Sequence, residues 1–239
     1  MTAHHRAAGL ADFAALLADK SRAAMCLALL DGRAWTAGEL AEHAGIAPST
    51  ATEHLNRLIT AGLLMERRQG RHRYVSLNGA DVAELLESMG ARLADGRPAP
   101  SGLRAASAGR ALARGRTCYD HLAGRLGIIL TDAMVDRDLI DLAGGFSLSP
   151  AGHAWFTEEL SVDTGEWARA GRPVVRECLD WTERRSHVAG IAGAELCRTF
   201  LKRGWVRRIG SGRAVKLTDA GVRVLGDFFD IDARERDLV

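Results

Sequence analysis

The sequence predicts a mostly α-helical protein with small β-hairpins, divided into two domains, and three observations support this fold class. Its 239 residues are enough for two modest domains that bury cores without disulfide bonds. Residues 35–74 follow the order helix, turn, helix, hairpin. Residues 109–239 contain two similar stretches, which predicts a repeated unit. We therefore expect domains at 1–95 and 109–239, joined by a linker at 96–108 that is rich in Pro, Gly, Ser and Ala.

Two apolar helices are expected at the start of the chain. Leu10–Leu17 is apolar at helical spacing, and a second helix begins at Ser21 and ends before Gly32. Cys26 lies within the second helix, where a free cysteine is most often part of a core.

The stretch Trp35–Tyr74 has local signals at each boundary. Thr36 and Glu39 have the spacing of a capping box, which starts a short helix. Gly45 then permits a turn, and Pro48 suits the first position of the next helix because its missing N–H costs nothing there. The apolar positions of that second helix recur at helical spacing: Ala51, Leu55, Leu58 and Ile59.

The opposite face of the second helix is polar, and a basic hairpin follows it. Outward positions are expected for Ser49, Thr50, Thr52, Glu53, His54 and Arg57. Leu63–Arg68 and Arg71–Leu77 flank Gln69-Gly70 as two strands, and four arginines gather there: Arg67, Arg68, Arg71 and Arg73. Such a helix can read base edges in the major groove, and such arginines can contact phosphates. The order is that of a winged helix-turn-helix, and these ten residues are the predicted contacts with double-stranded DNA.

These residues resemble the ArsR-type winged helix-turn-helix regulators, and the whole chain resembles a longer, two-domain branch of that family. The resemblance covers about residues 8–95 and rests on Asp19-Lys20-Ser21-Arg22, Glu39-Leu40-Ala41, Ser49–Leu58 and Ala61-Gly62-Leu63. It implies a homodimer, with the first helix and residues 80–93 forming much of the interface. It also implies repression by operator binding, released by a small-molecule inducer. Metal-sensing members carry a cysteine pair where residues 37–43 contain none, so that role is not carried over, and we predict no metal and no cofactor.

The second half reads as two copies of one unit, about 109–160 and 173–239. Arg116, Cys118 and Asp120 follow the pattern R-x-C-x-D, and the same pattern returns at residues 176–180. Each copy continues with His, Ala and Gly, then a hairpin, then a helix capped by Ser149 or Thr218. We therefore predict two degenerate winged-helix-like repeats.

Cys118, His121, Cys178 and His187 form a candidate sensor site. On a helix, Cys118 and His121 would share a face, whereas Cys178 and His187 are nine residues apart. Packing of the copies around a pseudo-twofold axis would bring all four together. Three interpretations stay open: close packing of the copies, a small-molecule pocket between them, and a metal or redox site.

The function predicted from these features is that of a DNA-binding transcriptional regulator. We expect a dimeric repressor controlled by a ligand or chemical signal at the C-terminal domain. The alternative is a protein-interaction module of winged-helix units that no longer binds DNA. An enzyme with Cys118 as nucleophile is not expected, because no nucleophile elbow or Gly-rich phosphate loop is present. The sequence has no signal peptide and no apolar run near 18 residues, which predicts a cytoplasmic protein with no membrane partner.

Overall fold

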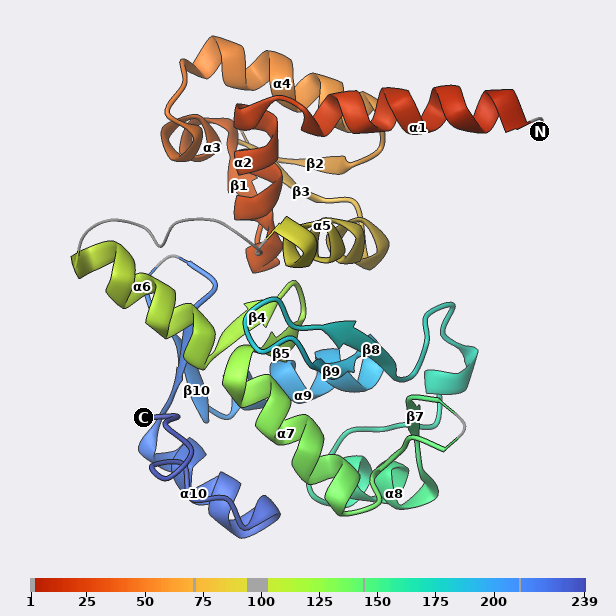
Figure 1. Cartoon of the computed structure of the whole chain (residues 1–239), viewed down its shortest axis with the longest axis vertical. Coiled ribbons are helices and arrows are strands. Elements are labelled where there is room, and N and C mark those ends of the chain that lie inside the picture. Colours follow the sequence, from red (N-terminus) through yellow and green to blue (C-terminus); the bar gives the residue numbers. More distant parts are fainter. Residues whose placement is uncertain (1–2, 71, 94–102, 144, 211) are drawn as a thin grey trace. The chain divides into compact units, whose positions relative to one another are not determined.

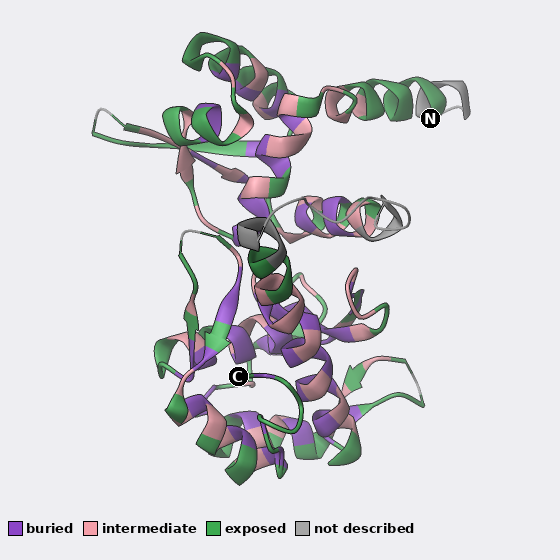
Figure 2. Cartoon of the chain, turned by 60° about the vertical axis from the view of Figure 1, so that its left-hand side comes forward, coloured by how far each residue is buried: buried purple, intermediate pink, exposed green. Residues whose placement is uncertain are grey.

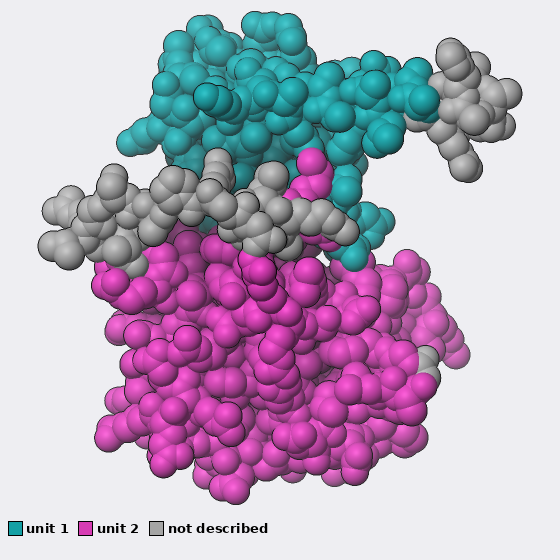
Figure 3. Space-filling view, in the orientation of Figure 1, with its two compact units in different colours: residues 1–86 teal, residues 87–239 magenta. Residues whose placement is uncertain are grey.

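The computed structural model describes residues 3–70, 72–93, 103–143, 145–210 and 212–239 (Figure 1). They divide into two compact units, Met1–Leu86 and Glu87–Val239 (Figure 3). In the described part of the chain, no helix has the length and apolar character needed to cross a membrane.

The first unit has the predicted order of helix, turn, helix and hairpin. Its elements are α1 (Ala3–Leu17), α2 (Lys20–Ala28), the 3-10 turn η1 (Leu29–Asp31), β1 (Trp35–Thr36), α3 (Ala37–Ala44), α4 (Pro48–Thr60), β2 (Leu64–Gln69), β3 (His72–Leu77) and the start of α5 (Ala80–Leu93). The strands form an antiparallel sheet in the order β1-β3-β2, with Arg68 opposite Arg73. The prediction of a winged helix-turn-helix at the N-terminus is confirmed.

Local chemistry explains the boundaries of α3 and α4. The Thr36 Oγ1 accepts a hydrogen bond from the Glu39 N–H at 3.3 Å, and the Glu39 carboxylate accepts one from the Thr36 N–H at 2.7 Å. This reciprocal pair is the predicted capping box. Gly45 ends α3 at a φ of +65°, a left-handed conformation that glycine adopts without strain. Pro48 opens α4 as predicted.

Removal of the capping hydroxyl should loosen the start of α3. We expect Thr36→Ala to cost about 1 kcal/mol of local stability, because one amide of the first turn loses its acceptor. Amide hydrogen exchange at Glu39 and Leu40 should then accelerate roughly 5-fold, as 1 kcal/mol implies. Thr60→Ala, at the exposed end of α4, serves as the control and should leave α3 unchanged. Equal exchange in both variants would show that the box contributes nothing.

The core of the first unit comes from α2, η1, α3, α4 and the hairpin. Its side chains have at most 1% of their surface exposed: Met25, Cys26, Leu29, Leu30, Leu40, Ala51, Leu55, Leu58, Leu63, Val75 and Leu77. Burial raises the pKa of the Cys26 thiol to about 12, so this cysteine is a neutral core side chain, as predicted.

The second unit has the same element order in its two halves after α6 (Leu103–Arg114). The first half contains β4 (Arg116–Cys118), β5 (His121–Ala123), α7 (Gly124–Asp136), β6 (Ile140–Asp141), β7 (Ser147–Leu148) and α8 (Pro150–Glu158). After the 3-10 turn η2 (Trp167–Arg169), the second half contains β8 (Arg176–Leu179), β9 (Ser186–Ala189), α9 (Gly190–Lys202), β10 (Val206–Arg208), β11 (Val215–Leu217) and α10 (Asp219–Phe229). Helix α6 begins inside the segment predicted as a linker, and the rest of that linker, 96–102, lies outside the described residues.

The two halves share one apolar core, which lies in the interior of the unit (Figure 2). Leu126, Leu130 and Phe156 of the first half belong to the same cluster as Leu196 and Phe200 of the second. Neither half therefore has a separate core.

Matching glycines allow α7 and α9 each to pack closely on the strand before it. A Cβ atom on Gly127 would lie 2.5 Å from the carbonyl oxygen of Leu122, and one on Gly193 would lie 2.5 Å from that of Val188. The predicted caps also match: the hydroxyl of Ser149 accepts from the Gly152 N–H, and that of Thr218 accepts from the Gly221 N–H. The predicted N-caps are thus confirmed in both halves.

Candidate functional site

Helix α4 presents a polar face opposite its buried one. Ala51, Leu55 and Leu58 are fully buried. Five of the six predicted DNA-contacting residues of this helix are exposed: Ser49, Thr50, Thr52, Glu53 and Arg57. Two of them are joined by a solvent-exposed ion pair, because the Arg57 Nη2 lies 2.6 Å from the Glu53 Oε1. An exposed pair of this kind is worth at most about 1 kcal/mol, so a phosphate can displace it.

His54, the sixth predicted residue of α4, is turned toward the preceding helices. Its Nδ1 lies 3.2 Å from the Arg22 guanidinium, and its Nε2 lies 3.7 Å from the Asp19 carboxylate. Arg22 also donates hydrogen bonds to the carbonyl oxygens of Leu16 and Ala15. These contacts hold α4 against α1 and α2. The role of His54 in reading DNA stays a prediction, and the structure gives this residue a positioning contact.

The β2-β3 hairpin carries the predicted arginines. Arg67 and Arg68 are exposed. Arg73 is half-buried and binds the Glu66 carboxylate at 2.6 Å and the Asn56 Oδ1 at 2.8 Å. Arg71 lies outside the described residues.

Asn56 was missed in the sequence prediction. It lies on the polar face of α4, and only its hydrogen bond with Arg73 shows that helix and hairpin are tied together at this point. The exposed residues of α4 and the exposed Arg67 and Arg68 therefore lie on two elements that this hydrogen bond joins.

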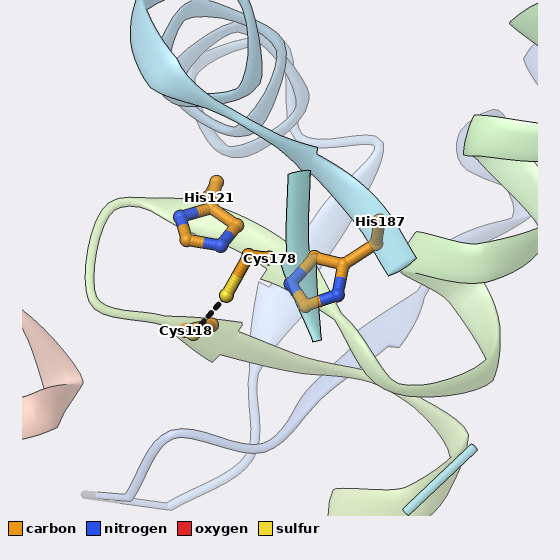
Figure 4. Close-up of side chains that lie close together, drawn as sticks. All are labelled: Cys118, His121, Cys178 and His187. Carbon is orange, nitrogen blue, oxygen red and sulfur yellow. Dashed lines mark hydrogen bonds between the residues drawn. The ribbon is translucent and has the colours of Figure 1, made fainter. Parts of the chain in front are cut away.

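The structure brings Cys118, His121, Cys178 and His187 together in the second unit (Figure 4). Cys118 lies opposite His121 in the β4-β5 pair, and Cys178 lies opposite His187 in the β8-β9 pair. The two sulfur atoms are 3.8 Å apart. One ligand atom from each residue can be chosen so that all four lie within 4.8 Å of one another, and all four residues are buried.

The helical spacing considered for Cys118 and His121 is wrong. Tyr119 and Asp120 form a two-residue turn between strands, with Tyr119 at a φ of +58°. Residues three apart are neighbours on a helix, but they are also direct cross-strand partners around a two-residue turn. The longer turn between Cys178 and His187 produces the same pairing with a nine-residue spacing.

Each histidine of the cluster has an aspartate behind it. The His121 Nδ1 is 3.2 Å from the Asp120 carboxylate, which accepts two hydrogen bonds from Arg172. The His187 Nδ1 is 3.9 Å from the Asp180 carboxylate. The Asp120 carboxylate is close enough to orient the His121 ring by a hydrogen bond, whereas Asp180 is too far from His187 to form one.

Asp180 is itself held by the other half of the unit. It accepts hydrogen bonds from the Arg116 guanidinium at 2.9 Å and from the Gly124 N–H at 2.6 Å. Burial works against its charged form, but Arg116 and these hydrogen bonds keep the pKa of its carboxyl well below the ordinary value.

The two thiols of the cluster differ in acidity. The hydrogen bond from Cys118 and the neighbouring imidazoles lower the pKa of the Cys178 thiol. That hydrogen bond, together with burial, raises the pKa of the Cys118 thiol. Burial disfavours a charged ring at His121, but Asp120 and Cys178 raise its pKa. The cluster thus favours a thiolate at Cys178.

Comparison with known proteins gives matches along most of the chain. A helix-turn-helix domain family matches residues 17–67. An uncharacterized HTH-type transcriptional regulator, YdfF of Bacillus subtilis (strain 168), is 36% identical over 215 residues, which cover 89% of this chain and 93% of that protein. The HTH-type transcriptional regulator CmtR of Mycobacterium tuberculosis (strain H37Rv) is 34% identical over 86 residues, covering 36% of this chain and 72% of CmtR.

One solved structure that matches part of the chain is a homodimeric winged helix-turn-helix DNA-binding domain from Mycobacterium bovis, itself called a possible ArsR-family transcriptional regulator. It is 23% identical, with a TM-score of 0.37, and the match covers 43% of this chain and 95% of that domain.

Proposed function

The chain belongs to the ArsR-like winged helix-turn-helix transcriptional regulators, and on this basis we propose that it is a dimeric repressor that binds an operator in double-stranded DNA. The polar face of α4 enters the major groove, and the β2-β3 hairpin contacts the adjacent phosphates. The observation that carries this proposal is the Arg73–Asn56 hydrogen bond, which joins the hairpin to the polar face of α4. Ser49, Thr50 and Arg57 are the side chains we expect at base edges or at the backbone.

Exposed apolar side chains support self-association. Leu10 on α1 is 71% exposed, Leu27 on α2 is 45% exposed and Leu85 on α5 is 42% exposed. A second copy of the chain would cover such side chains. In a symmetric dimer the two α4 helices would then read half-sites about 10 base pairs apart, or a multiple of that spacing.

We assign DNA binding to residues 1–95, a linker to 96–108 and control to 109–239, in a protein of the cytoplasm. The matching element order and matching glycines support the interpretation of 109–239 as two diverged winged-helix units. A signal at the cysteine–histidine cluster would change operator affinity only if it favoured one arrangement of the two DNA-binding heads over another.

Replacement of the exposed arginines of the hairpin should weaken operator binding. We expect Arg67→Ala/Arg68→Ala to lower affinity roughly 10-fold or more and to reduce the slope of log K against log salt by about 1 for each arginine–phosphate pair that the substitution removes. Fluorescence anisotropy at several salt concentrations, with DNA from upstream of the encoding gene, measures both quantities.

Arg198→Ala/Arg207→Ala is the matched control, because it removes the same charge from exposed positions of the second unit. This control variant should retain both the operator affinity of the unaltered chain and its slope of log K against log salt. Identical behaviour of the two double variants would contradict the wing assignment. Failure of the unaltered chain to bind any upstream fragment would favour the protein-interaction alternative.

A further inference from the structure

The cluster of Cys118, His121, Cys178 and His187 has the composition and geometry of a metal site. Each of two hairpins contributes one cysteine and one histidine from directly opposed strand positions. Figure 4 shows the four side chains converging from both hairpins. Two sulfur and two imidazole ligands are a set that tetrahedral Zn²⁺ sites use.

The spacing of the sulfur atoms agrees with tetrahedral coordination. Two thiolates, each about 2.3 Å from an ion and separated by a tetrahedral angle, lie about 3.8 Å apart. The Cys118 and Cys178 sulfur atoms are 3.8 Å apart. A disulfide bond would require about 2.05 Å.

Ring nitrogens in the cluster lack hydrogen-bond partners. The Nε2 of His121 and both ring nitrogens of His187 are buried and without a hydrogen bond to any described residue. Buried polar atoms are normally satisfied, because leaving them unpaired is costly. A bound cation would accept a lone pair from the Nε2 of each ring.

The aspartates behind the rings complete the arrangement. Metal-binding histidines usually direct their second nitrogen to a carboxylate, which fixes the tautomer and ring orientation. Asp120 is in hydrogen-bond contact with the Nδ1 of His121, and Asp180 is 3.9 Å from the Nδ1 of His187. The Asp120 contact therefore orients the His121 ring with its Nε2 available for an ion, whereas the His187 ring has both nitrogens free of hydrogen bonds to the described residues.

The space at the neighbouring crossing of the two halves is too small for an organic ligand. A cavity of about 10 Å³ there is lined by Gly127, Gly193, Leu122, Val188 and three further residues. A cavity of that size holds at most about one water molecule. Close packing of α7 and α9 on the strands before them explains the glycines, but it does not explain two buried histidines with unpaired nitrogens.

We propose that Cys118, His121, Cys178 and His187 bind one Zn²⁺, or a divalent cation of similar ligand preference, in a closed tetrahedral site. Binding releases to solvent the protons that the cysteines and histidines of the free cluster carry, and it leaves two thiolate–metal bonds. The ion links the two halves of the second unit. Metal binding at this site does not depend on the function proposed above. Only its role as the signal that releases the operator rests on that function.

A Co²⁺ titration of the reduced full-length chain tests the site. We expect one equivalent to bind, with the visible bands of a tetrahedral ion and a thiolate charge-transfer band, and we expect Zn²⁺ to displace it. Absence of these bands, or spectra typical of six oxygen ligands, would overturn the proposal. A Cys118–Cys178 disulfide in the isolated protein, with no Co²⁺ bound after reduction, would also overturn it.

Variants assign the ligands. Cys178→Ser should weaken binding at least about 100-fold, whereas Cys197→Ser, which alters a buried cysteine of the same unit outside the cluster, should not. Equal Co²⁺ affinity in the two variants would show that Cys178 is not a ligand. Because Cys178→Ser could disturb folding, His121→Cys provides a second measurement: a retained tetrahedral spectrum with a stronger charge-transfer band supports the site, and an unchanged spectrum contradicts it.

Operator binding, measured with Zn²⁺ and with a chelator, separates this proposal from the preceding one. Co²⁺ binding without any DNA binding would remove the proposed function and leave the site intact. DNA binding without Co²⁺ binding would remove the metal site and leave the proposed function intact.

Discussion

Replacement of Arg116 by methionine is expected to lower the free energy of unfolding of the second unit by about 3–5 kcal/mol. The Arg116 guanidinium and the Asp180 carboxylate are 2.9 Å apart, and their side chains are 1% and 0% exposed. Methionine fills much of the same volume but leaves the aspartate as a buried charge without its partner. That uncompensated charge, rather than the missing attraction itself, is the main cost.

Arg116 makes further contacts that methionine cannot make. It donates hydrogen bonds to the Leu112 carbonyl oxygen and to the Thr182 hydroxyl, and its guanidinium lies 4.6 Å from the centre of the Trp181 ring. Urea unfolding of the full-length chain, followed by tryptophan fluorescence, measures the effect, because four of the five tryptophans lie in the second unit.

The pH dependence of this loss has a definite sign. The pKa of Asp180 is lowered in the folded protein, so the stability that its ionised form contributes is present above the unfolded value of about 3.9 and is lost as pH falls through the folded value. In Arg116→Met the buried Asp180 carboxylate has lost its partner, so its charge destabilises the folded protein. The carboxylate therefore takes up a proton at a higher pH than in the unaltered protein. The difference in the free energy of unfolding between the unaltered protein and Arg116→Met should therefore shrink as pH falls from 7 toward 4.

Arg185→Met provides the control. Arg185 pairs with Asp132 at 2.6 Å, but the two side chains are 58% and 43% exposed, so the loss should be within about 1 kcal/mol. Arg116→Met/Asp180→Asn should recover part of the stability, since no buried charge then remains. If Arg116→Met and Arg185→Met lowered the free energy of unfolding by similar amounts, burial of the ion pair would not determine the effect of breaking it.

Two glycines of helix α10 should respond to alanine with opposite signs. A Cβ atom on Gly221 would lie 2.0 Å from the carbonyl oxygen of Trp205, so backbone would have to move. We expect Gly221→Ala to cost about 3 kcal/mol, at the upper end of overpacking effects. A Cβ atom on Gly226 meets nothing within 4 Å, and Gly226→Ala should stabilise the unit by about 0.5 kcal/mol, because alanine loses less backbone entropy in a helix.

The same urea experiment compares the two variants. They introduce the same atom five residues apart in one helix, so helix propensity alone would make both stabilising. If Gly221→Ala were as stable as Gly226→Ala, the close contact of α10 with Trp205 would be absent in solution.

The predictable parts of this structure are those with local causes. Thr36, Glu39, Gly45 and Pro48 determine the boundaries of α3 and α4 within a few residues of themselves, and the structure agrees with them. The repeated pattern around Cys118 and Cys178 was enough to suggest that the cysteines and histidines converge.

The remaining features depend on contacts between residues far apart in the chain. Residues three apart can belong to a helix or to a hairpin, so periodicity did not identify the strands that carry Cys118 and His121. The inward orientation of His54 depends on Arg22, 32 residues earlier. Nothing local indicates that the arginine of the first R-x-C-x-D pattern binds the aspartate of the second.

That exchange of partners between the halves affects the order in which the second unit can form. Arg116 leaves the ribosome 64 residues before Asp180, and Cys118 leaves it 60 residues before Cys178. Throughout that interval, the first half lacks the carboxylate that pairs with the buried Arg116 guanidinium, and it lacks the apolar side chains of the second half that complete its core. We therefore expect the second unit to complete its folding only after the second half has been synthesised.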